Sequence, residues 1–403
     1  MALVNAAVKL WTRGPAVSAR EWRKRALRTH YRRGITRAAT LEPADPTIVA
    51  AGLTLRAALI AASENKHRAA GYRVLMLRPG SITAAIWFAD LERCMQHAGI
   101  DCRVLPPGAP TREICAAIES LQPNVLIATE ATDTLRALDL AFLQRYKRAN
   151  GCLRLFIPVW RADAPRAQVP GVRSTPEQDE ERRRLRWSGL TADAYFSIFE
   201  PEFHERFSYD SRGPAIDYVT IAQGCNPFVD YPLATEKCHD YVMAASMTDE
   251  RVEVAYRYLR PILRRYQGMW VGPRWGFGTA AIAPAQMPQH YARTRIALSP
   301  LVGFVHTYGA EVTHRVFATA ACGAFQLTMP TSITYRYFTH GELVQAATPE
   351  EYSRLFDHYV GRPQERNPIA LAALRRVYGE HTCFHRIDRL VSHWNDWRGR
   401  GLF

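Results

Sequence analysis

The sequence predicts an α/β protein with two Rossmann-like domains and a basic helical extension at the N-terminus. Short apolar strands alternate with helices from Gly71 onward, and a segment rich in Pro and Gly at 224–237 divides this alternation into two series. Alternating strands and helices form parallel sheets covered by helices, and right-handed crossovers make each series Rossmann-like. The expected parts are an extension at 1–69, domains at 70–223 and 224–380, and a C-terminal helix at 381–403.

Length and composition agree with a two-domain globular protein. A chain of 403 residues is too long for one compact core, and 47% hydrophobic with 22% charged residues is an ordinary balance. The most apolar segment, 47–63, is interrupted by Arg56 and is interpreted as a buried or amphipathic helix. The first residues lack a signal-peptide core. A cytoplasmic location is therefore expected, with peripheral membrane attachment as the alternative.

The N-terminal extension carries most of the net charge. Residues 1–40 hold ten basic side chains and one acid, Glu21, so they supply +9 of the formal charge of +14. Trp11, Trp22 and Tyr31 are interleaved with the arginines, and a helix is expected from Ser18 to Arg33. Such a segment suits an anionic partner, either nucleic acid, a membrane surface or an acidic protein. A solvated basic helix without a partner is the alternative.

The first β-α series contains short apolar strands bounded by Gly, Pro and polar residues. Its expected strands are 71–79, 102–105, 124–129, 153–158, 194–199 and 217–222, and its expected helices are 47–69, 84–98, 111–120 and 134–149. Ligands of such sheets bind beyond the C-terminal ends of the strands. Glu130 and Asp133 follow one of these ends and are the best-placed candidates for a catalytic base. The alternative for both is N-capping of the next helix.

The second series starts at Asp240 and is richer in helix. Its expected strands are 240–246, 269–271, 295–299 and 325–328, and its expected helices are 249–266, 284–292, 311–321, 349–361, 366–379 and 381–397. In helix 249–266, Val252, Tyr256, Leu259 and Leu263 share one face, which indicates an amphipathic helix packed on the sheet.

The helix expected at 311–321 has features that suit a phosphate-bearing ligand. Its small side chains permit close approach, its N-terminus offers unpaired N–H groups, and Gly323 stands where a helix C-cap needs positive φ. Arg315 lies early in this helix and suits pairing with phosphate. The alternative for Arg315 is an ion pair with Glu311, four residues earlier.

The loop that starts at Gly272 follows a strand and is the second candidate for ligand binding. Gly272 permits close approach of a base or diphosphate, Arg274 supplies charge, and Trp275 supplies a stacking surface. A tight turn with a surface aromatic is the alternative. His306 and His314 are further candidates for contact with phosphate or sugar, although a lone histidine is commonly structural.

No metal site is expected. The eight cysteines form no CxxC pair. His381 and His385 share a helix face, but Thr382 stands where the zinc-protease pattern needs Glu.

The run Arg315–Thr328, RVFATAACGAFQLT, resembles glycosyltransferases similar to the spore maturation protein CgeB. The resemblance continues in Val271-Gly-Pro-Arg-Trp275 and in the downstream segments 337–344, 348–351, 362–366 and 377–386. It implies a GT-B enzyme of two Rossmann-like domains that face each other across a cleft. It also implies a nucleotide-sugar donor held mainly by the C-terminal domain, an acceptor on the N-terminal domain, and no obligatory metal. The donor site is expected to include Gly272, Arg274, Trp275, His306, Glu311, Thr313, His314 and Arg315.

One departure from the family pattern affects the expected activity. The family has Glu directly after Arg-Val-Phe, where it holds the donor ribose, and this chain has Ala318. The expected function is a hexosyl- or pentosyltransferase with an unidentified acceptor. The alternatives are a non-catalytic GT-B-fold binding protein with a degenerate donor site and a sugar transferase that modifies DNA bases.

Overall fold

The computed structural model describes residues 19–37, 40–80, 82–157, 177, 180–181, 192–200, 202, 217–278, 282–300 and 311–403. The chain divides into two compact units, which are described one at a time. Unit 1 consists of Met1–Leu55, Phe228–Thr307 and Arg315–Tyr378, and unit 2 of Arg56–Pro227, Tyr308–His314 and Gly379–Phe403. The central boundary lies close to the expected one. The two chain ends differ from expectation, because the N-terminal segment belongs to unit 1 and the last helix to unit 2.

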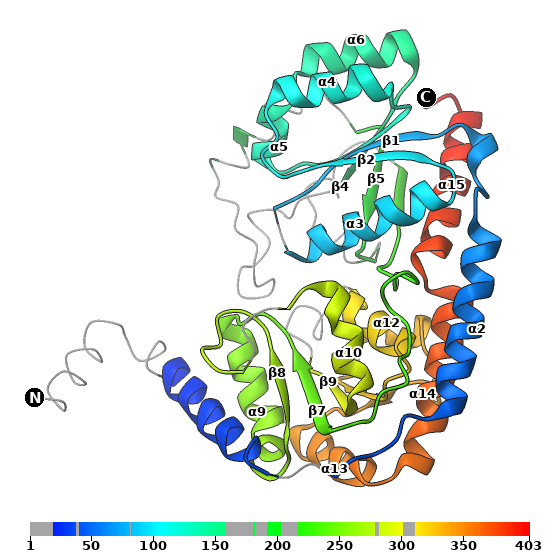
Figure 1. The fold of residues 1–403 in the computed structure, drawn as a ribbon. Coiled ribbons are helices and arrows are strands. Elements are labelled where there is room, and N and C mark those ends of the chain that lie inside the picture. The colour runs from blue at the N-terminus through cyan, green and yellow to red at the C-terminus, as the bar shows by residue number, and fades with distance from the viewer. Residues whose placement is uncertain are drawn as a thin grey trace, which may run out of the picture. The chain divides into compact units, whose positions relative to one another are not determined.

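Unit 2 is built on a six-stranded parallel sheet with the order β2-β1-β3-β4-β5-β6 (Figure 1). The strands are β1 Arg73–Leu77, β2 Asp101–Leu105, β3 Val125–Thr129, β4 Leu153–Ile157, β5 Ala194–Ser197 and β6 Asp217–Thr220. The strand positions predicted from the apolar runs are confirmed to within a few residues at each end.

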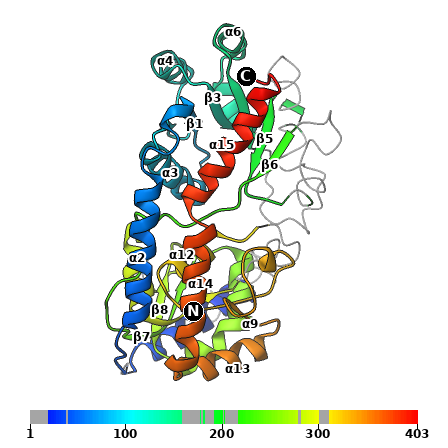
Figure 2. The same ribbon diagram turned by 90° about the vertical axis from the view of Figure 1, so that its right-hand side faces the viewer.

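Helices cover both faces of this sheet. They are α3 Ile82–His97, α4 Thr111–Leu121, α5 Thr132–Ala137, α6 Leu140–Asn150, α15 Cys383–Gly399 and the second half of α2 Pro46–Ser63, with a 3-10 helix at Arg68–Ala70. Helices α4 and α6 lie on one face and α3 on the other (Figure 1). Figure 2 shows α15 running alongside the sheet. The single helix expected at 134–149 is two helices, because Leu138 is extended and Asp139 caps α6 by accepting from Phe142 N.

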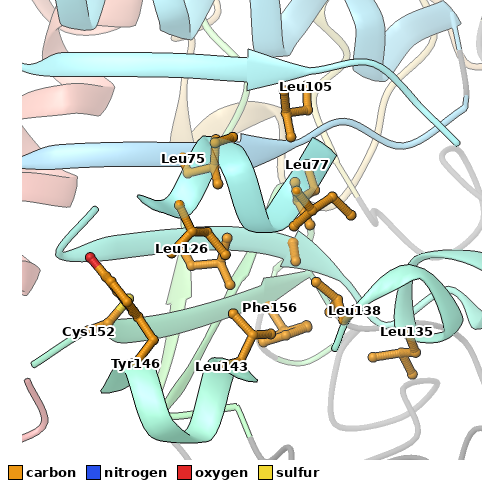
Figure 3. Close-up of a cluster of buried hydrophobic side chains, with 14 of the residues drawn as sticks. Leu75, Leu77, Leu105, Leu126, Leu135, Leu138, Leu143, Tyr146, Cys152 and Phe156 are labelled. Atoms are coloured by element: carbon orange, nitrogen blue, oxygen red, sulfur yellow. The ribbon is translucent and has the colours of Figure 1, made fainter. Parts of the chain in front are cut away.

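One hydrophobic cluster of unit 2 lies between the sheet and the face formed by α4, α5 and α6 (Figure 3). Leu75 and Leu126 of the strands and Leu143 of α6 are almost fully buried. The Tyr146 hydroxyl donates to Pro123 O at 3.0 Å, and burial raises the pKa of Tyr146 to about 12. All five residues of β3 are buried, as expected for a strand covered on both faces.

Unit 1 contains a five-stranded parallel sheet with the order β11-β10-β9-β7-β8. The strands are β7 His239–Ala244, β8 Gly268–Val271, β9 Thr294–Ser299, β10 Gln326–Thr328 and β11 Val344–Gln345. The two-residue strand β11 was not predicted, because it is too short to show a pattern. Numbered within each unit, both sheets begin with the order 2-1-3-4-5, the doubly wound arrangement whose switch point lies between strands 1 and 3.

The helices of unit 1 agree with expectation except at the starts of α12 and α14, each of which differs by three residues. They are α9 Asp249–Arg265, α10 Met287–Ala292, α12 His314–Ala321, α13 Pro349–Val360, α14 Pro363–Glu380 and the first half of α2, with 3-10 helices at Pro284–Gln286 and Thr334–Arg336. Val252, Leu259 and Leu263 of α9 are fully buried, which confirms its apolar face, whereas Tyr256 lies at the edge of that face. Helix α12 begins three residues later than expected.

The basic N-terminal segment is a packed helix of unit 1 rather than a free extension. Residues 19–34 are helical and lie beside α9 (Figure 1). Leu27 and Tyr31 are buried, and a Cβ on Gly34 would stand 2.6 Å from Tyr266 O, so the two backbones meet closely there. Arg20 pairs with Asp249 at 2.7 Å and Arg23 with Glu253 at 2.9 Å. The expected extension is therefore incorrect for residues 19–37.

Helix α2 is apolar along most of its length. Together with the 3-10 helix that follows, the stretch Pro46–Ala70 is long and apolar enough to cross a membrane by length and composition, and 17% of its most apolar window is buried. Of the two alternatives expected over 47–63, a fully buried helix is not found, since only Ile48, Gly52 and Ser63 are buried, and these three lie on one side, as in a helix packed along one face.

A cluster of buried charges joins the segment before α2 to the sheet of unit 1. Arg295 pairs with Asp240 at 2.6 Å and with Glu42 at 3.2 Å, and Arg366 also pairs with Glu42. Lys237 is buried beside them, and its Nζ donates to Thr294 O at 3.3 Å. Burial lowers the pKa of Lys237 to about 8, and Arg366 adds to this effect while Glu42 opposes it.

We expect Lys237→Met to stabilise the protein at neutral pH. Below about pH 8 the folded protein must hold a charged, desolvated ammonium, whereas in the unfolded chain this group stays charged up to its ordinary pKa of 10.5. The cost of the charge is thus fully present below pH 8 and disappears as the pH rises to about 10.5. Thermal unfolding of both proteins across this range should show a stability gap that closes with pH. A variant less stable than the parent at pH 7 would contradict this account.

Candidate functional site

The candidate site of unit 1 lies at the C-terminal edge of its sheet, around the switch point between β7 and β9. The loops that follow β7 and β8 are bonded to each other through their backbones. Ala245 N donates to Val271 O at 2.9 Å, and Met247 N donates to Pro273 O at 3.1 Å. The backbone at 244–247 is therefore a fixed wall that three of the predicted site residues contact: Gly272, Trp275 and Arg315.

Gly272 is required by the geometry of this wall. Its φ is 145°, and a Cβ built on it would lie 1.9 Å from Ala245 O. The close approach inferred from the sequence is present, but the group that approaches is the neighbouring backbone. The glycine shapes the edge of the site.

Trp275 does not form the stacking surface that the sequence suggested. Its side chain is 1% exposed, and its indole Nε1–H donates to Ala245 O at 2.7 Å. Its ring meets Trp270 at a centroid distance of 4.8 Å in an edge-on arrangement. Trp275 anchors the loop in the core. The alternative prediction, a tight turn that carries a surface aromatic, is therefore also wrong about this side chain.

Arg274 is exposed at the tip of the same loop. Its backbone is left-handed, with φ 70°, and its carbonyl oxygen accepts a bond from Lys24 Nζ at 3.0 Å. The predicted charge therefore faces solvent on a loop that the N-terminal helix braces.

Arg315 points toward the backbone wall from the first turn of α12. Its Nη1 donates to Ala244 O, and its Nε is buried with no hydrogen-bond partner among the described residues. Burial lowers the pKa of Arg315, and the hydroxyl groups of Tyr291 and Tyr352 only partly offset this effect. The ion pair with Glu311 is not formed, because α12 starts after Glu311 and the expected helical spacing does not apply.

The arrangement around Arg315 leaves a partly buried positive charge without an acidic partner in the described part of unit 1. A guanidinium group stays protonated at neutral pH, and burying such an ion costs roughly several kcal/mol unless an anion compensates it. A phosphate oxygen would satisfy both the charge and the free Nε donor. Arg315 is therefore the group of the candidate site whose surroundings suit an anion best.

Three of the predicted donor residues fall in a separate polar cluster of unit 2. His314 N donates to Gln223 Oε1 at 2.6 Å, and Gln223 Nε2 donates to Glu311 Oε2 at 3.3 Å. One orientation of the Gln223 amide satisfies both bonds. Thr313 lies between these residues, and its Oγ1 is buried without a hydrogen-bond partner among the described residues.

The same cluster continues to α3 through the imidazole of His314. His314 Nε2 lies 3.5 Å from Asp90 Oδ2, and Asn226 Nδ2 donates to Asp90 Oδ1 at 2.7 Å. Sequence reasoning missed Asp90, Gln223 and Asn226, since they come from distant segments and match no motif. The cluster fixes the position of His314 and suits a side chain that contacts a sugar or phosphate oxygen.

Arg386 of α15 holds the Gln223 segment in place. Its Nε donates to Ala222 O at 2.8 Å, and Nη2 donates to Gln223 O at 3.2 Å. Arg386 is 2% exposed. It lies in the run 377–386 that carries part of the family resemblance, and its packing gives that run a structural role.

Glu130 and Asp133, the two candidates for a catalytic base, lie in different environments. Glu130 is 2% exposed and its Oε1 accepts from the Tyr195 hydroxyl at 2.7 Å, whereas Asp133 is exposed in the first turn of α5. Neither is the N-cap residue, which is Ala131 without a side-chain cap. Burial leaves Glu130 poorly placed to reach an acceptor oxygen, so Asp133 is the more accessible of the two.

Two remaining predictions concern His306 and metal binding. His306 lies outside the described residues. Within the described ranges, no group of three or more His, Cys, Asp or Glu side chains is placed to hold a metal ion.

Comparisons with known proteins relate part of the sequence, and the fold, to glycosyltransferases. Residues 252–392, which contain Gly272 and Arg315, match the family model described as glycosyl transferase-like. The two parallel sheets with their helices have the GT-B glycosyltransferase fold.

Solved structures of low sequence identity share this fold. A sucrose-phosphate synthase from Thermosynechococcus elongatus matches with a TM-score of 0.56 and 9% identity, over 82% of this chain and 100% of that chain. Anabaena HepE in complex with UDP-glucose matches with a TM-score of 0.52 and 9% identity, over 80% and 99%. An α-glucosyltransferase in complex with UDP-glucose and DNA containing an abasic site matches with a TM-score of 0.52 and 10% identity, over 80% of this chain and 99% of that chain. No curated protein matches the chain.

We expect Gly272→Ala to destabilise unit 1 far more than Gly276→Ala. Both glycines have positive φ, but a Cβ on Gly276 would meet only the flexible Lys24 side chain at 4.0 Å, whereas on Gly272 it collides with Ala245 O. Gly276→Ala, the matched control, should lower the free energy of unfolding by about 1 kcal/mol, because only the backbone conformation is strained. Denaturant unfolding of the two variants measures the difference. Equal losses would mean that the loops after β7 and β8 are not held as described.

Proposed function

We propose that the protein is a glycosyltransferase that moves a hexosyl or pentosyl group from a nucleotide-sugar donor to an acceptor. The observation that carries the proposal is the partly buried guanidinium of Arg315, which faces the C-terminal edge of the unit 1 sheet with no acidic partner among the described residues. This position lies inside the segment that matches the glycosyl transferase-like family. A nucleoside diphosphate supplies the anion that this site requires, and HepE, with the same fold, binds UDP-glucose.

The proposed chemistry depends on charge stabilisation of the leaving group. When the glycosidic bond to the donor breaks, negative charge develops on the diphosphate, and a preorganised guanidinium stabilises it. The proposal includes no resident metal, because Arg315 provides the positive charge. His314, Glu311 and Thr313 are proposed to contact the sugar or the phosphates. The resemblance to CgeB-like enzymes supports a nucleotide-sugar as the donor and identifies no acceptor.

The acceptor is proposed to face unit 2, as the resemblance implies. Asp133 is kept as the candidate base for an inverting reaction, since it is the exposed member of the predicted pair. DNA is one acceptor class to test, because a neighbour with the same fold was solved with DNA. A cytoplasmic location agrees with all of these acceptors and is retained as part of the proposal.

We expect Arg315→Gln to weaken donor binding by about 10- to 100-fold, as for loss of a charge-assisted hydrogen bond. The parent is first screened against UDP-, GDP- and ADP-sugars by thermal shift, and the best donor is then titrated by calorimetry. Arg375→Gln, which removes an exposed charge from α14, is the control and should bind as the parent does. Arg315→Lys keeps the charge and shows how much the planar guanidinium contributes.

Absence of binding by every donor to well-folded parent protein would overturn the proposal. Equal affinities of Arg315→Gln and Arg375→Gln would remove Arg315 from the donor site.

The second candidate function is a binding protein that retains the fold without transfer. Ala318 favours it, because it stands where the family carboxylate holds the ribose and is only 4% exposed. In that case Ala318→Glu should create donor binding that the parent lacks, measured in the same thermal-shift screen. Tight donor binding by the parent would refute this alternative.

A further inference from the structure

Four arginines form an exposed face on the N-terminal helix. Arg25, Arg28, Arg32 and Arg33 are all exposed, and none of them forms an ion pair with a described residue. Arg25, Arg28 and Arg32 lie about one turn apart along the helix, so they share one side of it, and Arg33 adjoins that side. We call these four residues the arginine face. Arg20 and Arg23, by contrast, are neutralised by acids of α9.

Further positive charge from α9 adjoins the arginine face. Burial lowers the pKa of His30, and the positive charges of Arg264, Arg260 and Arg33 lower it further. The Arg260 guanidinium also lies over the Tyr256 ring, with its Cζ 4.9 Å from the ring centroid. The acid nearest to the arginine face along the helix, Glu21, is paired with Arg20 at 3.3 Å. The acids of α9 that reach this helix, Asp249 and Glu253, pair with Arg20 and Arg23, and no ion pair between the arginine face and another described residue is present.

Exposed apolar side chains accompany this charge. Trp22 is 59% exposed at the start of the helix and Ile35 is 46% exposed just beyond its end, while Leu41 is 61% exposed. They are three of the five large hydrophobic residues exposed in the described part of the chain, and all lie within twenty residues of one another. Single exposed hydrophobics are ordinary, but their concentration beside unpaired arginines is not.

The combination favours a lipid surface over nucleic acid. A bilayer with anionic lipids presents phosphate groups at its surface and apolar depth directly below, which matches arginines next to Trp, Ile and Leu. Single-stranded nucleic acid sites use a series of rings for successive bases, and Trp22 is the only exposed ring on this helix. The helix already buries Leu27 and Tyr31 in unit 1, so contact with lipid would be shallow.

We propose that the arginine face, with Trp22 and Ile35, docks unit 1 onto a bilayer that contains anionic phospholipid. This surface is separate from the candidate donor site and its function does not depend on the transferase activity proposed above. Each basic residue near such a surface adds to the attraction, and the attraction weakens as salt screens it.

The test compares two variants of the full chain that lose the same charge. Arg25, Arg28 and Arg32 are replaced by Gln in one, and the exposed Arg112, Arg145 and Arg148 of unit 2 are replaced by Gln in the other. Co-sedimentation with phosphatidylcholine vesicles, with and without phosphatidylglycerol, measures partitioning over a salt series. Three fewer basic contacts should lower partitioning of the first variant by about a hundredfold. The second variant should bind as the parent does.

A third variant, Trp22→Ser, separates the apolar contribution from the charge. It should keep the salt-sensitive binding and lose the part that persists at high salt, because burial of the indole does not depend on screening. Duplex and single-stranded DNA are titrated under the same conditions. Equal losses in the two triple variants, equal binding to vesicles that lack phosphatidylglycerol, or binding to DNA without binding to vesicles would each overturn the proposal.

Discussion

The parallel pairing of the strands is the constraint on which the rest of unit 1 depends. Because all five strands run in one direction, their C-terminal ends meet at a single edge, and the order of β8, β7 and β9 places the loops after β7 and β8 side by side. Those loops then bond to each other through their backbones, which leaves room for no side chain at Gly272. Arg315 and Trp275 are fixed by adjacent carbonyl oxygens, those of Ala244 and Ala245. The position of the unpaired guanidinium thus follows from the sheet topology.

The sequence predicted the regular elements well because apolar runs and helical spacing are local signals. It failed where one residue or a very short element decides the outcome, as at Asp139, whose cap divides one expected helix into α5 and α6, and at the two-residue strand β11. The N-terminal helix was expected to be an extension, although Leu27, Tyr31 and Gly34 have the spacing of a packed face. The many arginines of that segment led to the prediction of a solvated extension, and the apolar face formed by Leu27 and Tyr31 was overlooked.

The candidate site was predictable only in part, for a related reason. Gly272 could be predicted because it directly follows a strand, and Arg315 because it lies early in a helix; both residues lie at the expected edge of the sheet. Trp275 has the same local sequence context whether it stacks on a ligand or fills the core, and the structure places it in the core. Gln223 and Asp90 come from segments more than one hundred residues apart. Only the folded chain brings them to His314, so no spacing in the sequence reveals them.

The contacts between α15 and the first part of unit 2 have a consequence for folding. The Tyr72 hydroxyl, just before β1, donates to Asn395 of α15 at 2.6 Å, and Lys66 and His67 both contact Asp388 of the same helix. Residues 66–72 and α15 are separated in the sequence by most of unit 1, so bringing them together closes a long loop. During synthesis the β1 region is therefore made well before the helix that packs on it, and unit 2 completes its packing only after α15 has been made.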